Sequence, residues 1–125
     1  MAEQQPHLQA LSEQYQKFEQ ELQTSIQARQ KLESQHQENK NVQKEFSGLD
    51  DDANIYKLVG PVLLKQDKME AVMAVDGRLE FIENEIKRTE NQIKDTQEKS
   101  EKVKSEIIQI QSQEQQAPGS QQVAA

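Results

Sequence analysis

The side chains that most often carry chemistry are few in this sequence and lie far apart. His7 and His36 have no ligand residues around them, so we expect them to be solvated or at the edge of a helical contact, not to hold a metal. The run Asp50-Asp51-Asp52 lacks the alternating ligands and terminal glutamate of a calcium loop, which predicts a solvated turn. Neither a nucleophile–base pair nor a phosphate-binding loop is recognisable. The sequence therefore predicts no enzyme, no cofactor and no metal.

A short apolar segment at residues 55–64 has a composition unlike the rest of the chain. It reads Ile-Tyr-Lys-Leu-Val-Gly-Pro-Val-Leu-Leu and is rich in side chains that favour strands. The Gly60-Pro61 pair divides it, which predicts a hairpin at residues 54–66 with strands near 55–59 and 62–66. Proline in the second loop position is awkward, so the sequence leaves the register of this hairpin open.

The composition is too polar for a globular core. Hydrophobic residues make up 33% of the 125 residues, whereas globular domains have about 45–50% apolar residues. The formal charge is −7 and there is no basic block, so neither nucleic acid nor an anionic membrane is an expected partner. We find no signal peptide and no run of about 20 apolar residues that could span a membrane, and we expect a cytoplasmic protein.

Apolar residues at three- and four-residue spacing predict a helix on each side of the segment, near residues 7–47 and 68–114. The first helix has seam positions at Leu8, Leu11, Tyr15, Phe18, Leu22, Ser25, Arg29, Leu32, His36, Asn39, Gln43 and Phe46. Because this seam becomes polar in its middle, we expect Ile26 and Val42 beside it to compensate. Ser47-Gly48 is expected to end the helix, with glycine in the left-handed conformation.

The second helix carries the stronger heptad pattern. Its seam positions are Val72, Val75, Leu79, Ile82, Ile86, Thr89, Ile93, Thr96, Ser100, Val103, Ile107 and Ile110. Met69 and Met73 are expected to pack at the base of the helix. Gly77 costs about 1 kcal/mol relative to alanine inside a helix, and the sequence offers no firm reason for it. Residues 116–125 are expected to be a disordered tail.

The two helices and the segment between them predict a mainly α fold, an antiparallel two-helix coiled coil with a β-hairpin at its base. Residues 1–115 would form this single domain, and each arm of about 40 residues would span about 60 Å. The heptad registers agree if Leu8 faces Ile110, Tyr15 faces Val103 and Phe18 faces Ser100. Leu32 would then face Ile86.

The hairpin needs a partner, because an isolated hairpin is marginal in water and its free edges invite pairing. Pooling hairpins from several subunits into a closed β-barrel removes those edges. The alternative is a buried connector within one chain. At the far end of the coiled coil, apolar seam residues near the frayed termini could be offered to an external partner, or could simply form an ordinary seam.

The residues also resemble a known family. Tyr56-Lys57-Leu58-Val59-Gly60-Pro61-Val62-Leu63-Leu64-Lys65-Gln66-Asp67, with Arg78-Leu79-Glu80 and Glu85-Ile86-Lys87-Arg88, is similar to the prefoldin β-type subunits, and most similar to a eukaryotic member. The upstream Arg29-Gln30-Lys31-Leu32-Glu33 and Glu38-Asn39 agree. The similarity covers roughly residues 8–112, and the hairpin motif is its specific part.

The resemblance implies a heterohexamer of α- and β-type prefoldin subunits whose hairpins form a shared β-barrel. It implies an ATP-independent co-chaperone that holds unfolded clients of the actin and tubulin type and delivers them to the cytosolic group II chaperonin. Subunit assembly would involve Ile55, Tyr56, Leu58, Val59, Val62, Leu63 and Leu64. Client binding at the distal tip would involve Leu8, Leu11, Tyr15, Phe18, Val103, Ile107 and Ile110. The alternative function is a structural coiled-coil adaptor that binds folded partners.

Overall fold

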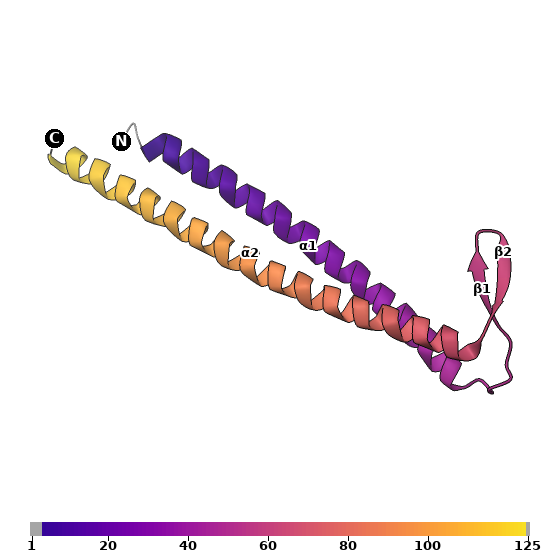
Figure 1. The fold of residues 1–125 in the computed structure, drawn as a ribbon. Helices are drawn as coiled ribbons and strands as arrows, with labels where there is room; N and C mark the ends of the chain where they lie inside the picture. The colour runs from indigo at the N-terminus through magenta and orange to yellow at the C-terminus, as the bar shows by residue number, and fades with distance from the viewer. Residues whose placement is uncertain (1–3, 125) are drawn as a thin grey trace. The chain divides into compact units, whose positions relative to one another are not determined.

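The structure, a computed structural model, describes residues 4–124 and the side chains of residues 5–115. Its elements in chain order are helix α1 (Gln4–Ser47), strands β1 (Ile55–Val59) and β2 (Val62–Gln66), and helix α2 (Lys68–Ala124) (Figure 1). Two long helices with a hairpin between them confirm the predicted fold class. Helix α2 continues past the end expected near residue 114. The side chains of residues 116–125 lie outside the described ones, and the disorder predicted for these residues stays a prediction.

The chain divides into two compact units, each of which contains a segment of both helices. The terminal unit comprises Met1–Gln27 and Glu90–Ala125, and the hairpin unit comprises Ala28–Thr89. Within each unit the α1 segment lies antiparallel to the α2 segment (Figure 1). In the described part of the chain, neither helix has a stretch apolar enough to cross a membrane.

In the terminal unit, the predicted seam positions are shielded from solvent. Every predicted position from Leu8 to Ser25 and from Ile93 to Ile110 is buried or half-buried. The Ser100 hydroxyl donates a hydrogen bond of 2.8 Å to Glu19 Oε1 on the other helix. Since Glu19 follows the residue expected opposite Ser100, this bond agrees with the predicted register.

The hairpin unit follows the same pattern. Its predicted seam positions from Arg29 to Phe46 and from Val72 to Thr89 are all buried or half-buried. Polar side chains make contacts between the helices: His36 Nε2 lies 3.1 Å from Glu83 Oε1, and Gln43 Nε2 donates to Asp76 Oδ1 at 2.8 Å. Each contact joins a seam residue of α1 to the residue that follows its expected partner on α2. His36 and Gln43 are thus paired across the helices, whereas the Asn39 amide donates to the Gln35 carbonyl of its own helix.

Two apolar residues do not have the role that we expected of them. Ile26 and Val42 remain 39% and 40% exposed, so the prediction that they fill the polar part of the seam is wrong. Each lies one helical position outside the seam line, and a step of one residue turns a side chain by about 100° around the helix. Both side chains therefore remain partly in solvent and do not close the seam.

Helix α1 ends at the predicted residue but not by the predicted geometry. Gly60 is the only described glycine with a positive φ, so Gly48 is not in the left-handed conformation. The last turn instead tightens through three-residue hydrogen bonds. The backbone N–H of Gly48 donates to the Glu45 carbonyl at 3.1 Å, and the Ser47 hydroxyl donates to the Lys44 carbonyl at 2.7 Å. These bonds satisfy the free carbonyls that a left-handed glycine would otherwise satisfy.

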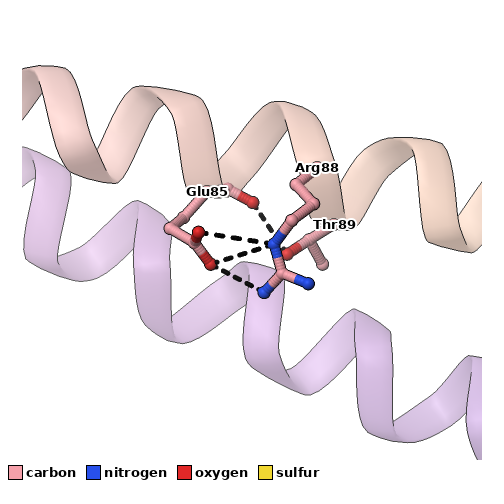
Figure 2. A network of polar contacts seen from close by, with 3 residues as sticks. All are labelled: Glu85, Arg88 and Thr89. Carbon is pink, nitrogen blue, oxygen red and sulfur yellow. Dashed lines mark hydrogen bonds and ion pairs between the residues drawn. The ribbon is translucent and has the colours of Figure 1, made fainter.

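A small polar cluster on α2 explains how a threonine is buried in the seam (Figure 2). The Thr89 hydroxyl donates to the Glu85 backbone carbonyl at 2.8 Å, which satisfies it although the residue is only 4% exposed. Arg88 Nη2 donates to Glu85 Oε2 at 2.7 Å on the solvent side. That hydrogen bond holds the pKa of the Glu85 carboxyl below its usual value and raises the pKa of Arg88.

Candidate functional site

The β-hairpin has one definite register, which the sequence had left open. Leu58 pairs with Leu63 and Val59 pairs with Val62, so Gly60 and Pro61 form a two-residue loop. Gly60 has a φ of 58°. Because the proline ring fixes a negative φ in the second position, the loop is a type II′ turn, which suits the twist of paired strands. Proline in this position is therefore compatible with the tight hairpin.

The two faces of the hairpin are both apolar. Side chains alternate between faces along each strand, and directly paired residues share a face. Face one carries Ile55, Lys57, Val59, Val62, Leu64 and Gln66, and face two carries Tyr56, Leu58, Leu63 and Lys65. A single-layer hairpin in water can bury neither face.

Most of the predicted assembly residues are freely accessible. Leu58 is 68% exposed and Leu63 is 62% exposed, and Tyr56, Val59, Val62 and Leu64 are also exposed. Ile55 differs, because it is buried in its own chain. It is the first residue of β1, next to the preceding loop, and contributes little free surface. Among the described residues the sheet has these two strands alone, and each strand has one edge without a partner strand.

The base of the hairpin is held by a lysine that sequence reasoning missed. Lys68 Nζ donates to the Leu49 carbonyl at 2.7 Å and lies 3.4 Å from Asp51 Oδ1. This contact joins the loop after α1 to the first residue of α2. The sequence gives no signal for this contact, because Lys68 is 17 residues from Asp51 and its nearer partner is a backbone carbonyl, which no residue pattern reveals.

Three large apolar side chains on α2 also lie in solvent. Met69, Met73 and Phe81 are 71%, 67% and 65% exposed, so the prediction that the methionines pack at the helix base is wrong. Met73 and Phe81 lie on the side of the helix opposite the seam, and Met69 lies beside the seam; this chain leaves all three largely uncovered. We call Met69, Met73, Gly77 and Phe81 the outer stripe. Their four-residue spacing was the signal in the sequence.

The predicted client residues lie together in the terminal unit, inside the seam. Leu11 and Val103 are buried, whereas the remaining five are half-buried, namely Leu8, Tyr15, Phe18, Ile107 and Ile110. Ile108, beside the seam, is 52% exposed. An open groove of about 360 Å³ lies over Phe18 and Val103 and is rimmed by Gln14, Lys99, Lys102 and Glu106. The terminal unit thus presents a narrow apolar strip with a charged rim.

The described residues contain no group of three or more His, Asp or Glu side chains that could hold a metal ion. His36 lies at the seam edge, as expected, with Glu83 as its partner. The exposed or partly exposed apolar surfaces of the described residues are the two-faced hairpin, the outer stripe and the strip in the terminal unit.

Comparison with known proteins agrees with this arrangement. The family description "Prefoldin subunit" matches residues 9–114. Prefoldin subunit 6 of Saccharomyces cerevisiae is 50% identical over 100 residues, which cover 80% of this chain and 88% of that protein. Prefoldin subunit 6 of Homo sapiens is 45% identical over 84 residues, covering 67% of this chain and 65% of that protein. The crystal structure of the prefoldin beta subunit from Thermococcus strain KS-1 matches with a TM-score of 0.76 at 32% identity, over 82% of this chain and 90% of that one. A family match over most of the sequence, together with the same helix–hairpin–helix order, shows that this chain belongs to the prefoldin family.

Proposed function

We propose that this chain is one subunit of a hetero-oligomeric, ATP-independent co-chaperone in the cytosol. In this proposal the β-hairpin assembles the particle and the terminal unit holds unfolded proteins. The clients would include proteins of the actin and tubulin type, and the assembly would deliver them to the group II chaperonin. The single observation that carries the proposal is the exposure of apolar side chains on both faces of the hairpin.

The assembly role follows from the cost of that exposure. Leu58 and Leu63 lie opposite each other on face two, and both are more than 60% exposed. Burying a leucine side chain is worth about 1.5–3 kcal/mol, so joining hairpins recovers a large free energy from these residues alone. Adding strands from other subunits also pairs the free edges of β1 and β2. A shared, closed sheet satisfies both requirements at once.

The client role rests on the terminal unit. Unfolded chains differ from folded ones chiefly in exposing apolar side chains and unpaired backbone. The open groove over Phe18 and Val103 offers an apolar floor, and Ile108 adds an exposed apolar contact beside the seam. The lysines and the glutamate on the rim keep the surface soluble while no client is bound. Shallow contacts of this kind suit weak, sequence-tolerant binding, which a holding chaperone needs in order to release its client.

A second candidate function is a structural adaptor that joins folded partners. The burial of Leu11 within the seam favours it, because that side chain stabilises the two helices and is not free to bind a client. An adaptor would use the exposed polar faces of the helices and would bind native proteins with defined stoichiometry.

Aggregation suppression by the whole assembly separates the two functions. The test variant is Phe18→Ser with Ile108→Ser, and the control is Ile26→Ser, which changes another exposed isoleucine of the same unit. Each is assembled with the partner subunits, and light scattering of a chemically denatured client is followed after dilution. We expect the test variant to lose suppression and the control to keep it.

The same assemblies are then offered native and denatured client in a pull-down. A co-chaperone retains only the denatured form. If an intact assembly of the test variant suppressed aggregation as well as the wild type, the client site would be misplaced. Equal retention of native and denatured protein would support the adaptor instead.

A further inference from the structure

The outer stripe of α2 is a second exposed apolar surface in the hairpin unit. Met69, Met73, Gly77 and Phe81 are four residues apart, so they follow one another along one side of the helix. The three side chains are each about two thirds exposed, whereas the seam residues are buried or half-buried. Single exposed apolar residues are common on protein surfaces, but an aligned set of three large ones indicates contact with a partner.

Gly77 points to the same conclusion by an independent route. Its φ is not positive, so the backbone does not require glycine. A Cβ built at Gly77 would meet nothing within 4 Å, so packing inside this chain does not require it either. Glycine nevertheless weakens a helix, because it has more freedom to lose on folding. The use that remains is to let another element approach the helix closely, as in helix–strand packing where a side chain would be in the way.

The hairpin is the kind of surface that fits the stripe. If hairpins join in a closed sheet, one face of each strand lines the interior and the other faces outward. Both faces of this hairpin are apolar, so the outward face still needs a cover, and a helix is the usual cover for a sheet. The hairpin does not use its own stripe for this, because both surfaces are exposed in this chain. Met69 follows soon after the end of β2 at Gln66, which places the stripe beside the assembling strands.

We propose that the outer stripe is a second assembly surface, which packs against the outward apolar face of a neighbouring subunit's β-hairpin with Gly77 at the point of closest approach. This inference rests on the proposed function, since it needs an assembly built from hairpins. It gives roles to Met69, Met73 and Phe81 as well as to the glycine.

A substitution at Gly77 tests this, because it should have opposite effects on the free chain and on the assembly. In the isolated chain, Gly77→Leu should raise the thermal stability of the helix, since leucine favours helices more than glycine does and a Cβ at this position meets nothing within 4 Å. In assembly with the partner subunits it should weaken association about tenfold or more, as overpacking does at a close contact. The control is Gln97→Leu, an exposed position on the same helix in the terminal unit, which should leave association unchanged.

A photo-cross-linking residue at Met73 identifies the occupant in the assembled particle. We expect cross-linked peptides from the hairpin of another subunit. Cross-links to the added denatured client alone would overturn the proposal. The proposal would also be overturned if Gly77→Leu associated with the partner subunits as tightly as the wild type does.

Leu58→Asp is measured beside these variants, so that a failure of the stripe proposal can be distinguished from a failure of the proposed function. If Leu58→Asp blocks assembly while Gly77→Leu assembles normally, the hairpin proposal stands and the stripe proposal fails. If Leu58→Asp assembles normally, the proposed function itself fails.

Discussion

Ser100 on α2 donates a 2.8 Å hydrogen bond to the carboxylate of Glu19 on α1, and this contact joins a seam residue to an exposed residue beside the seam of the terminal unit. Ser100 is only 4% exposed, so its hydroxyl has little access to water and depends on Glu19. A double-mutant cycle with Ser100→Ala and Glu19→Ala should give a coupling free energy of about 1 kcal/mol. The measurement is urea unfolding of each variant followed by circular dichroism. The cycle matters because alanine also favours helices, which obscures either single change. Coupling indistinguishable from zero would show that the bond does not hold the two helices in register.

The pair of Glu85 and Arg88 should give a small acid-dependent contribution to stability (Figure 2). Because Arg88 lowers the folded-state pKa of Glu85 below 4.5, the pair stabilises the fold above the unfolded pKa. That stabilisation is lost as the pH falls through the lowered pKa. Arg88→Gln should therefore reduce Tm slightly at neutral pH and leave it unchanged in strong acid. Arg78→Gln on the same helix is the control. A deficit that persisted unchanged in strong acid would mean that Arg88 acts by packing rather than by charge.

Gly60 should be far less replaceable than its neighbour in the hairpin turn. Its φ of 58° is unfavourable for residues with a Cβ, at a cost of about 1–2 kcal/mol. Gly60→Ala should therefore weaken assembly by about tenfold and leave the helical signal unchanged. Pro61→Ala is the matched control, because alanine adopts the negative φ of that position without strain. Association by titration with the partner subunits measures both. Equal effects of the two substitutions would argue against the type II′ turn.

The helical seam was predictable because it depends only on the periodicity of side chains along each helix. Every predicted seam position is buried or half-buried, including polar ones such as Arg29 and Asn39. The hairpin was predictable from its strand-forming residues and from the Gly60-Pro61 pair. Its register was not fixed by the sequence, because the geometry of the turn depends on the φ that Gly60 adopts.

Contacts that depend on side-chain reach or on backbone atoms could not be predicted. The bond from Lys68 to the Leu49 carbonyl joins residues that only the turn brings together. The contact between His36 and Glu83 requires two particular side-chain conformations. The exposure of Met69 and Met73 was missed for another reason, since hydrophobicity alone does not say whether a surface is covered within the chain or by a partner.

Native mass spectrometry of one substitution tests whether the apolar hairpin assembles the particle. Leu58→Asp places a charge in the middle of face two, and Leu49→Asp makes the same change at an exposed leucine outside the hairpin. Both variants are expressed together with the partner subunits, and circular dichroism confirms that the helices remain. We expect intact hetero-oligomers with Leu49→Asp and none that contain Leu58→Asp. Hetero-oligomers of normal mass and abundance that contain Leu58→Asp would show that the hairpin does not assemble the particle.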